Sequence, residues 1–140
     1  MKRFVCVLLI LLLIPLFACA DTFSDSFNTL APGFNIQKLA EYTAEDGSNY
    51  YASGFTFIFP SEGMITVIGT TPFEVITVAC CAIRAMDGTG DDVNQFGCVL
   101  RSYYTAQSGV TDENRISKTE TGITVLASIE NGYITFGLVR

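Results

Sequence analysis

Residues 70–88 read TTPFEVITVACCAIRAMDG, and the fold class depends on whether this stretch is a strand or a helix. Its valines and isoleucines are typical of a strand. Its ends favour a helix, because Thr71 can act as the N-cap, Pro72 can occupy the first helical position and Glu74 can complete a capping box. The final glycine provides a stop. We therefore predict a helix over residues 72–86, buried over most of its surface.

The next stretch, DDVNQFGCVLRSYYTAQ at residues 91–107, predicts a second helix with Asp91 as its N-cap. A short loop containing Thr89 and Gly90 joins the two segments. Two helices joined by so short a loop are expected to pack as an αα-hairpin.

Three cysteines lie in this hairpin. Folding the chain about the loop places Cys81 and Cys98 at the same level, with Cys80 one position away. In an oxidising compartment this arrangement predicts a disulfide between Cys81 and Cys98, or between Cys80 and Cys98. The alternative is that the cysteines are small packing residues between the helices.

Stretches with a period of two lie on both sides of the hairpin. YYASGFTFIFP at residues 50–60 predicts one strand, and MITVIGT at residues 64–70 predicts its return. An aromatic stripe such as that of residues 50–60 is core more often than binding platform, so we expect it to be buried. Residues 123–130 and 133–140 predict a hairpin about an Asn-Gly turn, and RISKTE at residues 115–120 predicts an outer strand.

The segment before the first strand is less regular. NIQKLAEYTAEDG at residues 35–47 predicts a short helix capped by Asn35, and DTFSDSFNTLAPGF at residues 21–34 predicts a linker or tether. The element order is therefore α-ββ-αα-βββ. It indicates one α+β domain over residues 35–140, with an antiparallel sheet of about five strands and the helices on one face.

The first twenty residues have the features of a signal peptide. Lys2 and Arg3 precede an unbroken apolar run over residues 4–17, and small residues follow. A basic start, a run of this length and a small-residue exit are typical of secretory signals. The run is short for a transmembrane helix, which needs about 20 residues. We predict that residues 1–20 direct export.

Two cleavage positions fit this signal. Residues 18–20 form an A-x-A-like site that is cut before Asp21. The stretch LFAC at residues 16–19 resembles the lipobox of bacterial lipoproteins, which implies cleavage before Cys19 and a lipid on its sulfur. It departs from that pattern at Phe17, where a small or β-branched residue is usual. We favour lipidation of Cys19, which makes the membrane a partner; either route places the mature chain outside the cytoplasm.

Charge and composition exclude several functions. The eight basic residues include Lys2 and Arg3, whereas all fourteen acidic residues follow Ala20, so removal of residues 1–20 changes the net charge from −6 to −8. An acidic chain repels phosphate backbones, so we expect no nucleic-acid partner. The absence of histidine excludes Ser-His-Asp and Cys-His catalysis and zinc sites with histidine ligands.

These observations predict a non-catalytic exported envelope protein, lipid-anchored, with a small binding domain whose protein or small-molecule ligand the residues do not identify. We expect no catalytic residue, cofactor or metal. The alternatives are a soluble secreted binder or inhibitor, and a small hydrolase that uses a pair of carboxylates. Candidates for such a pair are Glu41, Glu45, Asp46, Glu62, Glu74 and Glu130.

Overall fold

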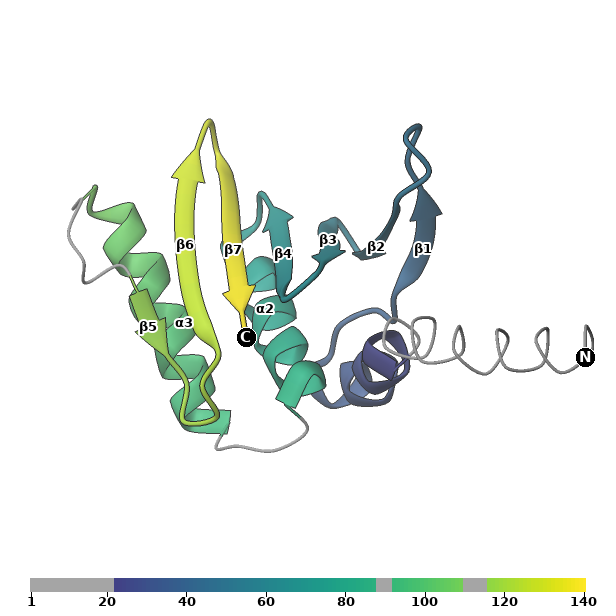
Figure 1. The fold of residues 1–140 in the computed structure, drawn as a ribbon. Coiled ribbons are helices and arrows are strands. Elements are labelled where there is room, and N and C mark those ends of the chain that lie inside the picture. Colours follow the sequence, from purple (N-terminus) through teal and green to yellow (C-terminus); the bar gives the residue numbers. More distant parts are fainter. Residues whose placement is uncertain (1–21, 88–91, 110–115) are drawn as a thin grey trace, which may run out of the picture.

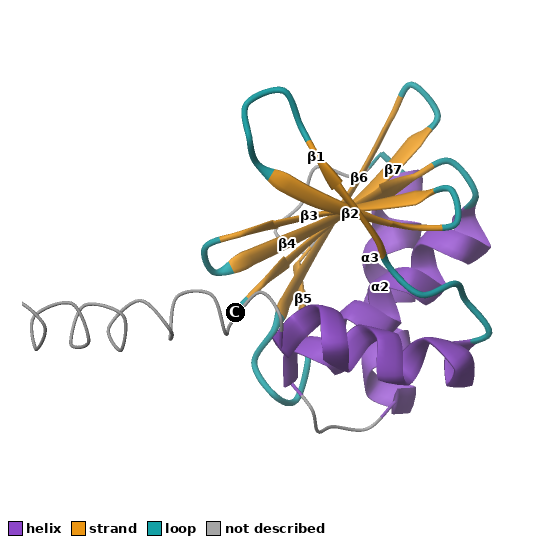
Figure 2. Ribbon diagram, turned by 90° about the vertical axis from the view of Figure 1, so that its right-hand side faces the viewer, coloured by secondary structure: helices purple, strands orange, loops and turns teal. Residues whose placement is uncertain are grey.

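The computed structural model describes residues 22–87, 92–109 and 116–140. Seven antiparallel strands form one sheet in the order β1-β2-β3-β4-β7-β6-β5 (Figure 1). The described helices gather on one side of this sheet, and no described helix lies on the other side (Figure 2). The α+β class and the order of elements are confirmed, but the sheet has seven strands where about five were expected.

The sheet consists of two antiparallel meanders that meet at the pairing of β4 with β7. The first contains β1 (Ala40–Thr43), β2 (Asn49–Ser53), β3 (Thr56–Ser61) and β4 (Met64–Gly69), and the second contains β5 (Ile116–Lys118), β6 (Thr124–Glu130) and β7 (Tyr133–Val139). The predicted Asn-Gly hairpin is confirmed, because Asn131 and Gly132 both have positive φ, 51° and 81°. A two-residue turn of this kind matches the twist of the strands that it joins.

The central helix α2 (Pro72–Asp87) lies against the sheet and forms the middle of the core. The helical prediction for residues 72–86 is confirmed, as is the second helix, α3 (Asp92–Gln107). The capping box is not formed. The Glu74 carboxylate instead accepts hydrogen bonds from the Phe55 N–H at 2.8 Å and the Thr56 hydroxyl at 3.0 Å. It therefore ties the first turn of α2 to the turn between β2 and β3.

A close approach between α2 and β4 depends on Gly69, the last residue of β4. A Cβ atom at this position would lie 2.6 Å from Cγ2 of Val75 and 3.2 Å from the Thr56 hydroxyl oxygen. Real Cβ atoms do not approach that closely, so any side chain at this position would push α2 away from the sheet.

The linker predicted at residues 21–34 is wrong for the part that the structure describes. Residues 22–30 form a helix, and Ala31–Phe34 continue as a short 3-10 helix, η1. Phe27 is completely buried in the core, and its carbonyl oxygen lies 3.8 Å from the sulfur of Cys81 in α2. One buried aromatic side chain holds this polar segment on the domain, which therefore begins before residue 35.

The helix predicted at residues 35–47 is also wrong. Asn35 ends η1 in a left-handed conformation instead of starting a helix, and β1 begins at Ala40. Strand β1 turns back to β2 at Asp46 and Gly47, where the Asp46 carboxylate accepts hydrogen bonds from Ser48. Pairing with β2 satisfies the backbone groups of β1 that face β2, and an Asp-Gly step is a common hairpin turn.

Candidate functional site

The described helices lie on one face of the sheet, and the opposite face has no described helix against it (Figure 2). Pairing register assigns the side chains to faces, because alternate residues of a strand point to opposite sides. On β3, Thr56 and Ile58 are buried toward the helices, so Phe57 and Phe59 lie on the open face.

Four aromatic residues form a row on this open face, which we call the aromatic ladder: Tyr42, Tyr50, Phe57 and Phe59. The rings of Tyr42 and Tyr50 stack with centroids 5.5 Å apart, and those of Tyr50 and Phe59 stack at 5.4 Å. Phe57 lies 6.2 Å from Tyr50 in a tilted arrangement. The ladder therefore crosses β1, β2 and β3. Ring pairs at these separations contribute beyond the area that they bury, so they hold one another in place.

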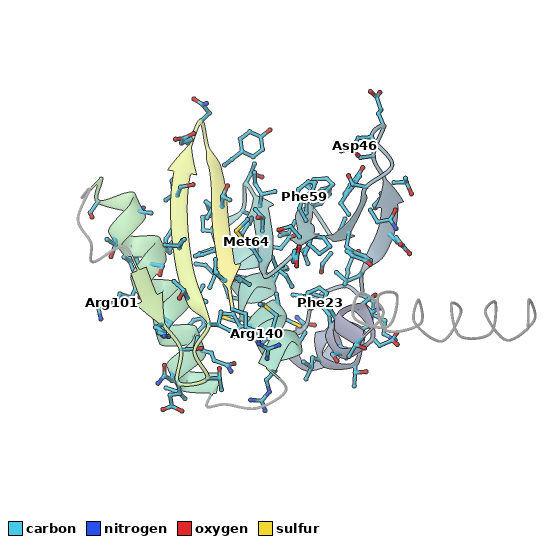
Figure 3. The ribbon with its side chains drawn as sticks, viewed as in Figure 1. Phe23, Asp46, Phe59, Met64, Arg101 and Arg140 are labelled. Atoms are coloured by element: carbon cyan, nitrogen blue, oxygen red, sulfur yellow. The ribbon has the colours of Figure 1, made fainter. Side chains whose placement is uncertain are left out.

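The ladder remains accessible to a partner. Tyr42 is 47% exposed, Phe57 41% and Phe59 43%. Apolar side chains continue the surface across β4 and β6, where Met64 and Leu126 are also exposed. Figure 3 looks onto this face and shows Phe59 and Met64 near its centre.

The prediction that the aromatic stripe of residues 50–60 is buried is wrong, because a turn interrupts it. Strand β2 ends at Ser53 and β3 begins at Thr56, with Gly54 at φ +61° between them. This tight turn changes which residues face the helices, so Tyr51 is buried whereas Phe57 and Phe59 are not. The Ser-Gly dipeptide inside the pattern is a turn signal that could have indicated the break.

Charge is nearly absent from the open face. Among the positions that the pairing places there, only Lys118 on β5 and Glu130 at the end of β6 are charged, and their charges cancel. The face is therefore electrically neutral on a chain whose net charge is −6. Depletion of charge and enrichment of aromatic side chains are typical of the centre of a protein interface.

The structure does not bring the predicted cysteine pairs together. Cys80, Cys81 and Cys98 are all thiols. The Cys81 sulfur faces the Phe27 carbonyl, whereas the Cys98 sulfur lies 3.5 Å from the Lys118 carbonyl oxygen on β5. Burial, together with the neighbouring Cys80, raises the pKa of Cys81 to about 12, and burial also raises the pKa of Cys98. Cys19 lies outside the described residues.

The candidate carboxylates occupy separate places. Glu74 is bound to the turn between β2 and β3, and hydrogen bonds from Ser48 lower the pKa of Asp46 in the first hairpin turn. The other four are exposed on strands or turns: Glu41, Glu45, Glu62 and Glu130. Glu74 and Asp46 thus make structural hydrogen bonds with backbone and hydroxyl groups.

An apolar pocket with a volume of about 280 Å³ lies in the helix layer. It lies between η1, α2 and α3 and is lined by Phe34, Phe73, Thr77, Cys80, Gln95 and Phe96. Ligand pockets are usually larger, about 300–1,000 Å³. The open sheet face is the more extensive candidate surface.

No protein-family model, no curated protein and no solved structure matches this chain. Within residues 22–87, 92–109 and 116–140, no helix has the length and apolar character needed to cross a bilayer.

Proposed function

We propose that this protein is an exported, lipid-anchored, non-catalytic interaction domain, and that its open sheet face binds a second copy of the same chain. The observation that carries the proposal is the aromatic ladder on a neutral, uncovered face. Such a surface offers apolar area and ring edges to a partner, and it offers few charged groups that a catalytic cleft would need.

The charge of the chain favours a second copy as the partner. Two chains of net charge −8, the value after removal of the signal, repel each other wherever their acidic surfaces meet. The open face has no net charge, so contact through it adds no repulsion between neighbouring groups. The second copy also supplies the same apolar, strand-built face, and two sheets pack face to face at about 10 Å.

The size of the face fits a modest dimer. Seven strands about 4.8 Å apart and about 20 Å long offer roughly 600 Å² on each copy. The two copies together would bury about 1,200 Å², at the lower end of stable interfaces. Anchoring on a membrane raises the effective concentration of each copy for the other, so an interface of this size suffices there.

Analytical ultracentrifugation of the mature protein over a range of concentrations tests the partner. We expect a monomer–dimer equilibrium that Phe59→Ser weakens about tenfold, the effect of losing one central aromatic contact. Phe55→Ser is the matched control, because Phe55 is 84% exposed at the turn and lies outside the ladder. A wild-type protein that stays monomeric, or a Phe59→Ser variant that dimerises as well as wild type, would exclude the second copy as the partner.

A Cys19→Ser variant tests the anchor separately. Two acyl chains on Cys19 would bind the protein stably to a membrane. We expect the variant to lose globomycin-sensitive processing and lipid-dependent membrane retention. A wild-type protein found entirely in the medium and starting at Asp21 would instead identify a soluble secreted binder.

A further inference from the structure

A second concave site lies at the opposite edge of the sheet from the aromatic ladder. It is a hollow of about 340 Å³ between α3 and β5, which we call the edge hollow. Its lining consists of Asn94, Gly97, Cys98 and Arg101 from α3 and Ser117 and Lys118 from β5. The four helical positions lie on one face of α3, because residues three and four apart are neighbours on a helix.

The Ser117 hydroxyl is a buried polar group in the edge hollow without a hydrogen-bond partner among the described residues. The Ser117 side chain is 5% exposed. Ser117 pairs with Val125, a buried residue on the helix side of the sheet, so its hydroxyl faces α3 and the hollow. Buried hydroxyl groups are almost always paired, so the Ser117 hydroxyl needs a partner inside the hollow, which a water molecule or a bound group can supply.

Gly97 supplies an independent observation. Glycine in the interior of a helix is unfavourable compared with alanine. Packing does not require it at this position, because a Cβ atom on Gly97 would meet nothing within 4 Å. The missing side chain keeps the wall of the edge hollow open between Asn94 and Arg101.

The charge of the edge hollow is positive. Arg101 is exposed, and its guanidinium makes no hydrogen bond or ion pair with the described part of the chain. It stands beside β5 in Figure 3. The Cys98 thiol donates toward the Asn94 side-chain oxygen and the Lys118 carbonyl oxygen, at 3.4 and 3.5 Å. Burial raises the pKa of Cys98, so the thiol is uncharged and does not repel an anion.

We propose that the edge hollow binds a small oxyanion, namely a carboxylate or phosphate group. The planar guanidinium of Arg101 can donate two parallel hydrogen bonds to either group. The Ser117 hydroxyl and the side-chain amide of Asn94 supply further donors. This site shares no residue with the aromatic ladder. Of its lining, only Lys118 also belongs to the open face, and the donors named here, Arg101, Ser117 and Asn94, lie outside the proposed dimer surface.

NMR titration of ¹⁵N-labelled protein tests the site, with sodium phosphate and sodium acetate in separate series and sodium chloride at matched ionic strength as the reference. We expect saturable shifts of the Gly97, Cys98 and Ser117 amides with phosphate, acetate or both. The series that saturates at the lower concentration identifies the preferred oxyanion. Shifts that chloride reproduces, or none that saturate at millimolar concentrations, would overturn the proposal.

Two variants separate specific binding from general attraction to positive charge. Arg101→Gln should lower the affinity at least about tenfold, because it removes a charged hydrogen-bonding partner. Lys38→Gln removes the same charge from an exposed position away from the hollow and should leave the affinity unchanged. Equal losses of affinity in the two variants would show that the anion is only attracted to the positive charge of the chain in general, and would refute the site.

Ser117→Ala provides the decisive readout. If the Ser117 hydroxyl donates a hydrogen bond to the bound oxyanion, its removal should weaken oxyanion binding several-fold. The melting temperature of the free protein should stay the same or rise. A hydroxyl with only a structural role would give the reverse result, unchanged binding with a lower melting temperature.

Discussion

Replacing Phe27 with alanine should remove the contact that holds residues 22–30 on the domain. Phe27 has no exposed surface, and its ring lies 6.0 Å from that of Phe23. Deleting a fully buried phenylalanine side chain costs about 3–5 kcal/mol, because transfer energy is lost and a cavity remains. For a domain of this size that loss lowers the melting temperature by roughly 10–25 °C.

Chemical denaturation followed by circular dichroism measures this loss, with Phe55→Ala as the matched control. Phe55 is 84% exposed, so the same substitution there should change stability by less than about 0.5 kcal/mol. Both variants lose an aromatic side chain, so the difference between their free energies of unfolding measures the contribution of burial alone. If Phe27→Ala were no more destabilising than Phe55→Ala, residues 22–30 would not belong to the folded domain and the original linker interpretation would stand.

Four further predictions concern groups inside the domain. Glu74→Ala should lower stability by about 1–3 kcal/mol in urea denaturation, because it leaves two donors of the turn between β2 and β3 without an acceptor. Gly69→Ala should cost about 1–3 kcal/mol through overpacking, whereas Gly137→Ala should be tolerated because its Cβ would meet only ordinary contacts at 3.8 and 3.9 Å. Ellman's reagent at mildly alkaline pH should modify Cys98 before Cys81, which is fully buried. Because the pKa of Cys81 is raised to about 12, the unfolded chain loses this proton first, so stability should fall as the pH rises above the ordinary thiol value of about 8.5.

The glutamate, glycine and alkaline-pH predictions each have an outcome that would contradict them. Glu74→Ala should be compared with Glu62→Ala at an exposed turn, and equal effects would show that the hydrogen bonds of Glu74 do not stabilise the fold. Equal stability of the two glycine variants would contradict the close approach of α2 to β4. If the stability of a Cys81→Ala variant fell as steeply at alkaline pH as that of wild type, the loss of stability would come from groups other than Cys81.

The two long helices could be predicted because local signals and tertiary packing agree. Pro72 suits a first helical position, and the apolar residues of 72–86 suit a segment that is buried nearly all round. The hairpin about Asn131 was predictable for a similar reason, since its turn chemistry alone selects the conformation. In these segments no long-range contact opposes the local preference.

The N-terminal third could not be predicted because its structure depends on distant partners. Nothing local distinguishes Phe27 from other phenylalanines in a polar segment, and residues 22–30 pack on the core through Phe27, with Phe23 and Leu30 beside it. Strand β1 is exposed along its whole length and depends on pairing with β2. The candidate binding surface was missed for a different reason, because one turn at Gly54 moves Phe57 and Phe59 from the expected core to the open face.

If Cys19 carries the proposed lipid anchor, the position at which the described fold starts determines how far the domain lies from the membrane. With lipid on Cys19, only Ala20 and Asp21 lie between the anchor and the first described residue of the helix at residues 22–30. Three extended residue steps reach about 11 Å, whereas a free stalk of a dozen residues would span about 20 Å on average and far more when stretched. The domain would therefore sit directly on the headgroups with restricted rotation, below the reach of partners that cannot approach the bilayer. A shedding protease needs an accessible stretch of unfolded chain, so a stalk this short would also keep the domain from being released by cleavage next to the membrane.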